Sequence, residues 1–461
     1  MECSTVVRQS GQDEERVYRK VTRRLLPILL VCYLLAYLDR INIGFAQVAM
    51  REDLGFSADV YGFGSGILFI GYLLFEVPSN YLLERIGARK TLARITFLWG
   101  LISAGMMFVQ TPMQFYVMRF LLGVAEAGFF PGVILYLTYW YPAERRAKIV
   151  ALFMTPIAFS GFIGGPLSGW IMQNMAGING WKSWQWMFLI EGLPSVAMAF
   201  FVLLFLVDRP SEARWLDDDE KRLVVRATAP AAGHHRNSFR ASFARLLKEP
   251  GLYAMLLVYF ALICGVVTTA SWIPALLHAV FPLGTPLQLG LLTAIPYALG
   301  GIGMIWIGRH SDRTQERRWH CTLSLLAGAI GIAVLGWNAS SLSIAVIAMS
   351  IASIGIFAGF PTFWAASTAR LDHETSATGI ALISSVGLLG GFISPIVIGN
   401  VRTATGSYAG GLYAVAFVML LGAVAICMVL GERHRMAPAC GARVGEMPAG
   451  EQEKLDEGAR I

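Results

Sequence analysis

Two pairs of opposite charges lie inside otherwise apolar segments of the chain. Asp39 and Arg40 are adjacent within the apolar stretch 25–50, and Arg119 and Glu126 lie in a later one. About 20 apolar residues suffice to cross a bilayer. An ionisable group at that depth is costly, so it normally faces a protein interior or a wet cavity. The two charged pairs therefore indicate movement of a charged solute or of a proton.

The spacing of these residues limits how they can act. Neighbours on a helix project about 100° apart, so Asp39 and Arg40 cannot both face one partner, and one can face a cavity while the other faces a helix. Arg119 and Glu126 share one helix face, about 10 Å apart. An arginine fork binds a carboxylate through two bonds and stays charged. Burial and a nearby guanidinium shift the pKa of a carboxylic acid in opposite directions, which allows proton exchange near working pH.

A structural role for these charges is the alternative. An ion pair between Asp39 and Arg119, or between Arg40 and Glu126, would hold the N-terminal half together without touching a substrate. Both roles can operate in one transport cycle, so the sequence leaves them open.

The composition is that of a membrane protein. Of 461 residues, 56% are hydrophobic and 15% charged, and the mean hydropathy is +0.58, whereas a soluble domain carries about 25% charged residues. The six cysteines are scattered without metal-ligand spacing, and we expect His234 and His235 to be solvated rather than to bind a metal. The net charge of +7 does not indicate nucleic-acid binding, because the basic residues do not form a face. We predict no enzyme active site, cofactor, metal or cleaved signal peptide.

Twelve apolar segments of spanning length predict an all-α membrane protein, because helices satisfy their own backbone groups in lipid. A barrel's alternating pattern is missing. The predicted spans are 25–49, 60–83, 91–110, 113–138, 147–175, 184–207, 251–280, 287–308, 321–339, 341–367, 376–401 and 410–431.

Loop charges orient these spans and a hydrophilic break divides them. Only Arg51, Lys182 and Arg402 fall in loops after odd-numbered spans, so the positive-inside rule places both termini in the cytoplasm. The break at 208–250 separates two six-helix bundles. The predicted organisation is a cytoplasmic tail 1–24, a bundle 25–207, a cytoplasmic linker 208–250, a bundle 251–431 and a cytoplasmic tail 432–461.

The two halves each contain a short loop with a similar pattern of charges. The loops 80–90 and 308–318, after spans two and eight, each carry an acid, an arginine and a basic pair. Such loops can hold helix ends together through charge pairs and release them when the bundles rock. We therefore predict gating roles for Arg85, Arg89, Asp312 and Arg313. The alternative is that these positive charges only set the topology of the chain in the membrane.

Seven short segments of the chain form a recognisable set. They are 37–44 (YLDRINIG), 71–80 (GYLLFEVPSN), 119–131 (RFLLGVAEAGFFP), 191–194 (EGLP), 208–210 (DRP), 213–216 (ARWL) and 310–314 (HSDRT). With them, from about residue 23 to 431, the chain resembles a major facilitator superfamily transporter, and within it the anion:cation symporter family, with its bacterial permeases for tartrate, phthalate, hexuronates and aldonates. The resemblance implies proton-coupling roles for Asp39 and Glu126, anion-binding roles for Arg40 and Arg119, and a hydrogen bond from Tyr72.

The C-terminal half departs from this family in span eleven. The family commonly shows Asn-Ser-x-Gly-Asn there, whereas this chain has Ser384 and Leu388 at the two amide positions. That loss of hydrogen-bonding groups favours a less hydroxylated or aromatic carboxylate over a sugar acid. Ser384 and Trp364 are the predicted substrate contacts from this half, and further candidates for the cavity wall, at a mid-membrane site between repeats, are Thr268, Thr269, Ser271, Trp272 and Phe363.

The expected function is proton-coupled uptake of a small organic carboxylate by alternating access. We expect a multi-pass monomer in the lipid bilayer of a bacterial inner membrane, with no nucleic-acid partner. The alternative is a proton-coupled efflux antiporter for drugs or metabolites, which the arginines disfavour for a cationic drug. A nutrient sensor without transport activity would be expected to carry a longer extension.

Overall fold

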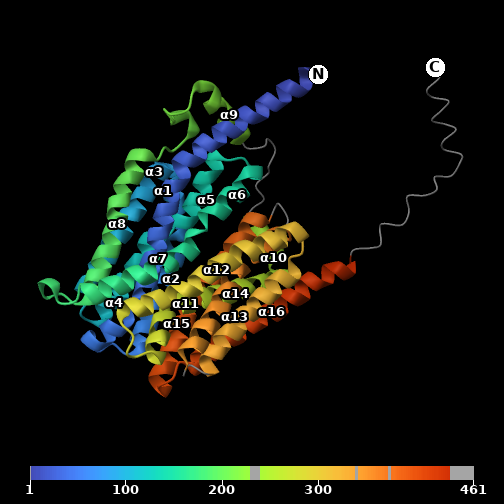
Figure 1. The fold of residues 1–461 in the computed structure, drawn as a ribbon. Helices are drawn as coiled ribbons and strands as arrows, with labels where there is room; N and C mark the ends of the chain where they lie inside the picture. Colours follow the sequence, from blue (N-terminus) through green and yellow to red (C-terminus); the bar gives the residue numbers. More distant parts are fainter. Residues whose placement is uncertain (1, 229–238, 338–340, 372–374, 437–461) are drawn as a thin grey trace, which may run out of the picture.

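The computed structural model describes residues 2–228, 239–337, 341–371 and 375–436. Within these ranges every regular element is a helix, and twelve helical segments are long and apolar enough to span a membrane. Figure 1 shows two groups of helices, one from each half of the chain, packed side by side. The predicted all-α fold of two six-helix bundles is confirmed.

The N-terminal half contains α1 (Glu2–Leu54), α2 (Ala58–Ile86), α3 (Ala88–Gly105), η1 (Met106–Phe108), α4 (Pro112–Glu126), α5 (Phe129–Trp140), α6 (Ala143–Phe153), α7 (Pro156–Asn174), η2 (Ile178–Gly180) and α8 (Ser183–Phe205). The linker contains η3 (Pro210–Glu212), α9 (Asp218–Thr228) and α10 (Phe239–Leu246). The C-terminal half contains α11 (Pro250–Val280), α12 (Pro286–Thr314), α13 (Arg318–Trp337), α14 (Leu342–Thr368), α15 (Ser376–Thr405) and α16 (Ala409–Met436).

Spans four and five are each built from two helices, whereas the sequence predicted unbroken spans. Helix α4 ends at Glu126, and Gly128 follows with a φ of +85°. A side chain at this glycine would be strained, and its Cβ would lie 2.5 Å from the Ser79 Oγ. The second break, between α6 and α7, falls just before Pro156. The first break places the Glu126 carboxylate at a helix end.

Spans four and eight begin with the same local signal. Thr111 and Thr285 cap α4 and α12, and each accepts a hydrogen bond from the backbone N–H of the glutamine three residues later, Gln114 or Gln288. The side-chain Oε1 of the glutamine in turn accepts a hydrogen bond from the backbone N–H of the threonine. Proline at the first helical position has no N–H that would need a partner. The sequence Thr-Pro-x-Gln thus starts equivalent helices in both halves.

The two halves meet tightly at the end opposite to the start of α1. A Cβ on Gly44 of α1 would lie 2.6 Å from the Ala270 carbonyl oxygen, and one on Gly165 of α7 would lie 2.6 Å from that of Gly290. Small residues let helix backbones approach this closely in lipid. The Thr403 Oγ1 also donates to the Asp59 carboxylate at 2.8 Å across the halves. This end of the bundle is therefore closed.

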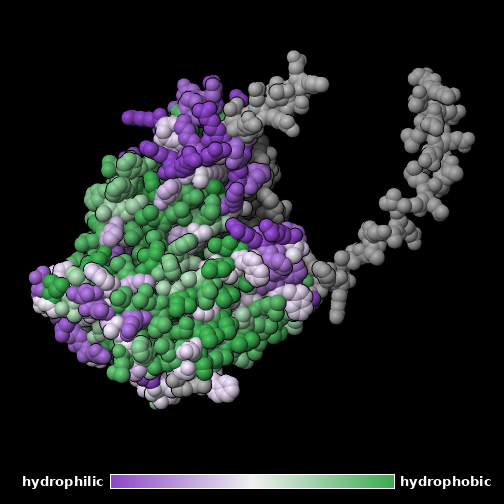
Figure 2. Space-filling model, viewed as in Figure 1, coloured by the Kyte–Doolittle hydropathy of each residue, from purple (hydrophilic) through white to green (hydrophobic). Residues whose placement is uncertain are grey.

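The surface agrees with a protein embedded in a bilayer. Figure 2 shows hydrophobic residues over the helices and hydrophilic residues gathered at the end where α1 begins and α9 lies. Many large apolar side chains of the helices are exposed, among them Leu204, Trp306 and Phe108, each more than 70% exposed. Lipid chains, rather than water, would cover such a surface.

Candidate functional site

A cavity of about 1220 Å³ lies between the two halves. Helices of both halves line it, chiefly α1, α2, α6, α11, α12 and α14, with a few residues each from α4, α5 and α15. It extends to exposed charged residues at the mouth, including Lys148, Arg309 and Asp312. At the other end the Tyr61 hydroxyl donates to the Ile43 carbonyl oxygen at 2.8 Å and lies 3.2 Å from that of Ser271, and the Tyr61 ring packs against Trp272. The cavity is thus open at one end and closed at the other.

Arg40 and Glu126 form an ion pair in the wall of this cavity. The Arg40 Nε and Nη2 both donate to the Oε2 of Glu126, at 2.8 and 2.6 Å. The Glu126 side chain is 1% exposed and that of Arg40 is 24% exposed, so the guanidinium is the more accessible partner. The other carboxylate oxygen, Oε1, has no hydrogen-bond partner among the described residues. The pair therefore leaves a free oxygen on the acid and a reachable cation.

Asp39 faces away from the cavity, unlike its neighbour Arg40. The Ser103 hydroxyl of α3 donates to the Asp39 Oδ1 at 2.6 Å, and the Asn42 amide lies 3.5 Å from the same oxygen. Asp39 is buried and does not line the cavity, and no described residue bonds its Oδ2. The structure thus separates the two adjacent charges, one toward the cavity and one toward α3.

Arg119 and Tyr72 also line the cavity. The Arg119 Nε donates to the Gly64 carbonyl oxygen at 3.3 Å, and this side chain is only 3% exposed. The Arg40 guanidinium carbon lies 5.2 Å from the Tyr37 ring centre and 5.6 Å from that of Tyr72, within the range of a cation–π contact. The N-terminal half therefore brings both predicted arginines, Glu126 and Tyr72 to one wall.

The C-terminal half supplies an aromatic wall. Trp364 and Ser384 line the cavity, as does Ser271, whereas the other candidate wall residues Thr268, Thr269, Trp272 and Phe363 do not. The Trp364 ring lies 5.0 Å from that of Tyr259. The sequence analysis missed four aromatic residues of this wall, because in the sequence they look like ordinary apolar residues of a span: Tyr259, Tyr297, Phe357 and Phe360.

Among the described residues, the first predicted gating loop has polar contacts with the end of α8 and the start of the linker, and the second has polar contacts within the C-terminal half. In the first loop, the Arg89 backbone N–H donates to Asp208 at 2.8 Å and its Nε to the Leu203 carbonyl oxygen at 2.6 Å. The Arg85 guanidinium carbon lies 4.5 Å from the Tyr81 ring centre. The Arg89 contacts tie α3 to the end of α8 and to the residues after it, whereas the Arg85 contact lies within α2.

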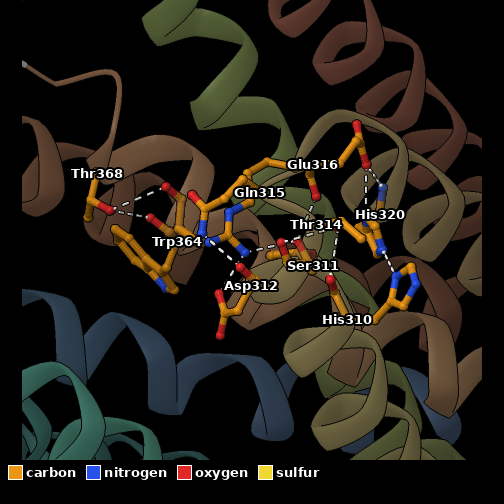
Figure 3. Close-up of polar contacts among 12 residues, drawn as sticks. His310, Ser311, Asp312, Thr314, Gln315, Glu316, His320, Trp364 and Thr368 are labelled. Atoms are coloured by element: carbon orange, nitrogen blue, oxygen red, sulfur yellow. Dashed lines mark hydrogen bonds and ion pairs between the residues drawn. The ribbon is translucent and has the colours of Figure 1, made fainter.

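The second loop joins α12 to α13 and lies at the cavity mouth. Asp312 forms an ion pair with Arg317 at 2.7 Å, and Arg313 is exposed. Figure 3 shows a chain of contacts from His310 through His320 to Glu316. The Nδ1 of His310 lies 2.7 Å from the Nε2 of His320, and the Nδ1 of His320 lies 2.7 Å from the Oε2 of Glu316. Partial burial alone would raise the pKa of the Glu316 carboxyl, but hydrogen bonds from the Trp319 and His320 N–H groups outweigh it and lower that pKa.

No group of three or more His, Cys, Asp or Glu side chains with metal-binding geometry occurs in the described ranges. His234 and His235 lie outside those residues, as does most of the predicted tail 432–461. The arrangement that remains is a two-bundle helical protein with a charged and aromatic cavity at the interface of the bundles, which is the architecture of a secondary transporter.

The model of the Major Facilitator Superfamily matches residues 29–395, and the chain belongs to this superfamily. An Agrobacterium vitis protein named "Putative tartrate transporter" is 44% identical over 434 residues, which are 94% of this chain and 98% of that protein. An Acinetobacter baumannii protein named "Quinolone resistance transporter" is 38% identical over 423 residues, 92% of this chain and 96% of that protein.

A solved structure with the same fold is a bacterial homologue of the human lysosomal transporter Spinster in an inward-facing, unoccupied conformation. Its TM-score is 0.73 at 17% identity, and the match covers 90% of this chain and 98% of that one. Together with the family match, these findings identify a multi-pass transporter of small organic substrates, not an enzyme.

Proposed function

We propose that the chain is a proton-coupled symporter of a small organic carboxylate. The observation that carries this proposal is the Arg40–Glu126 ion pair in the cavity wall. The similarity to a protein named as a tartrate transporter supports an organic acid as cargo. We propose that a single chain is the working unit, with the cavity between its own two halves.

The ion pair suggests how proton and substrate are coupled. While Glu126 is ionised, it occupies the Arg40 fork with two bonds to one oxygen. A proton on Glu126 removes the negative charge, so the guanidinium becomes free to bind the substrate carboxylate bidentately. Arg119, in the same wall, supplies a second positive charge. Substrate and proton therefore load together, and the pair re-forms only after both have left.

The cavity walls favour a carboxylate attached to an aromatic ring. The N-terminal wall holds Arg40 and Arg119, and aromatic rings lie in both walls, with Tyr259 and Trp364 in the C-terminal one. None of the described lining residues is Asn, Gln or His, so the cavity has no side-chain amide or imidazole with which to bind the hydroxyl groups of a sugar acid. A planar ligand would place its carboxylate on Arg40 and its ring against Trp364.

Replacing Trp364 with leucine tests the ring contact. We expect Trp364→Leu to weaken binding of benzoate about two- to tenfold, since an aromatic pair contributes about 0.5–1.5 kcal/mol beyond area burial. Thermal shift of the purified protein measures this. The control Trp306→Leu removes an exposed tryptophan outside the cavity and should leave binding unchanged. A wild-type preference for gluconate over benzoate would contradict the aromatic specificity alone, whereas stabilisation by no carboxylate would contradict the transport proposal.

Efflux is the second candidate, because the aromatic wall and the relative named as a quinolone resistance transporter favour it. Under this alternative the same cavity loads from the cytoplasm and protons return through Glu126. Proteoliposomes with a pH gradient of known sign distinguish the two: symport concentrates labelled carboxylate on the side to which protons move, and antiport depletes it there.

The proposed location is a bacterial inner membrane, with both termini and the open cavity mouth at the cytoplasmic face. The scarcity of basic residues in loops after odd-numbered spans supports this orientation. We expect a green fluorescent reporter fused after Ile461 to fluoresce and alkaline phosphatase fused there to stay inactive. An insertion at Gly406, in the loop after α15 at the closed end, is the control and should show the reverse. Active phosphatase after Ile461 would refute the orientation.

A further inference from the structure

Five basic residues form a stripe on α1, just before its apolar part. The sequence analysis expected no face of basic residues, but these side chains are all exposed and surround one hollow of about 450 Å³. Their spacing of three, one, three and one residues places them on one side of a helix. The basic stripe consists of Arg16, Arg19, Lys20, Arg23 and Arg24.

Few of the charges in the basic stripe are paired with an acidic side chain. Glu14 and Glu15 both pair with Arg145 of α6, at 3.3 and 2.6 Å, and Glu15 also interacts electrostatically with Arg19, one turn further along α1. Of the stripe, Lys20 pairs with Glu220 of α9 at 2.6 Å. The four arginines have no ion pair with any described residue. Most of the positive charge of the stripe is therefore outside ion pairs.

Packing fixes the direction in which the basic stripe faces. Val17, Tyr18 and Val21, on the opposite side of the helix, are at most 5% exposed. The Tyr18 ring stacks with that of Tyr141 at 5.9 Å, and the Thr22 and Tyr141 hydroxyls are 3.0 Å apart. The extension of α1 is thus anchored to the bundle, and its arginines are presented outward at fixed positions.

The basic stripe continues into the apolar part of the same helix face. Pro27 and Val31 follow Lys20 and Arg24 by seven residues, or two turns, and both are exposed outside the cavity lining. Arg16 lies about 12 Å beyond Arg24 along the axis. Each headgroup layer of a bilayer is about 5–8 Å thick. The stripe therefore spans the headgroup layer while the same face below it meets acyl chains.

We propose that the basic stripe binds the phosphate of an anionic phospholipid in the leaflet at this end of the bundle. Guanidinium forks match phosphate geometry, and each Lys or Arg near an anionic surface attracts it by about 1 kcal/mol. A lipid is the occupant because the charged face runs without interruption into an exposed apolar one. This site is separate from the central cavity, so it does not depend on the proposed transport function.

The test compares two variants of equal charge in the purified full-length protein. The triple variant R16Q/R19Q/R23Q removes part of the stripe, and R222Q/R226Q/K248Q removes three exposed cations elsewhere. Native mass spectrometry with phosphatidylglycerol and phosphatidylcholine measures the bound lipid. We expect the stripe variant to lose about a hundredfold in affinity for phosphatidylglycerol, and the control to bind like wild type. Binding should weaken as salt is added.

Three outcomes would overturn the proposal. The first is equal binding of the two lipids to wild type, and the second is unchanged phosphatidylglycerol binding in R16Q/R19Q/R23Q. The third is binding of glycerol 3-phosphate or of a short oligonucleotide as tight as that of phosphatidylglycerol, because the ligand would then be a free phosphate or a nucleic acid. Detergent micelles have no inside, so a role of the arginines in setting topology cannot produce the effect. If the triple variant fails to fold, R16Q alone, at the residue farthest from the span, should lower the affinity several-fold.

Discussion

Replacing Arg40 with lysine is expected to lower the uptake of substrate carboxylate by about thirtyfold or more, because disrupting a buried, hydrogen-bonded charge pair costs about 2–5 kcal/mol. Lysine keeps the charge but lacks the fork that both binds Glu126 through Nε and Nη2 and would bind the substrate. Arg119→Lys should act in the same direction, since Arg119 lies in the same wall. Initial uptake rates at several substrate concentrations measure the loss.

The control for Arg40 is Lys148→Ala at the cavity mouth. This change also removes a positive charge that lines the cavity, but from an exposed position where solvent screens it, so we expect uptake within about twofold of wild type. Arg40→Lys and Arg119→Lys variants that transport with unchanged apparent affinity would show that neither arginine binds the carboxylate.

The fold was predictable because it depends on patterns that extend over the whole chain. Twelve long apolar segments and one hydrophilic break determine the number of spans and their division into halves. Local interruptions were not predictable in the same way. The break after Glu126 depends on the left-handed backbone of Gly128 against Ser79 of another helix. A glycine in an apolar segment carries no such information by itself, because its partner is distant in sequence.

The site, too, was predictable only in part from the sequence. Charged residues in an apolar segment are conspicuous, so Arg40, Arg119 and Glu126 could be proposed from sequence and do lie in the cavity wall. Aromatic residues are common in spans for packing alone, so Tyr259 and Tyr297 gave no signal. Trp272 shows the converse error: it was a candidate wall residue, but it packs between Tyr61 and Tyr408 at the closed end.

Neutralising Glu126 is expected to uncouple transport from the pH gradient. In Glu126→Gln, accumulation driven by a pH gradient should fall to the background level, because the residue can no longer take up and release a proton. Exchange of labelled for unlabelled substrate should persist, since a glutamine imitates the protonated acid at nearly the same volume and leaves Arg40 free. Asp39→Asn is expected to lose driven accumulation as well, and at least one of the two variants should retain exchange. Proteoliposome assays with and without a gradient measure both activities.

A purely structural ion pair would give a different result. Removing one partner of a buried pair destabilises a protein by about 3–5 kcal/mol when the other charge stays uncompensated, so low expression, a lowered melting temperature and joint loss of accumulation and exchange would follow. Glu191→Gln is the matched control, because Glu191 is equally buried and accepts a hydrogen bond from Ser168 at 2.7 Å, but it does not line the cavity. It should keep driven accumulation.

The proton-site prediction is stronger for Glu126 than for Asp39, since only Glu126 of the two lies in the cavity wall with a free carboxylate oxygen. Well-folded Glu126→Gln and Asp39→Asn proteins that still concentrate substrate along the pH gradient would end the assignment of proton sites to these residues.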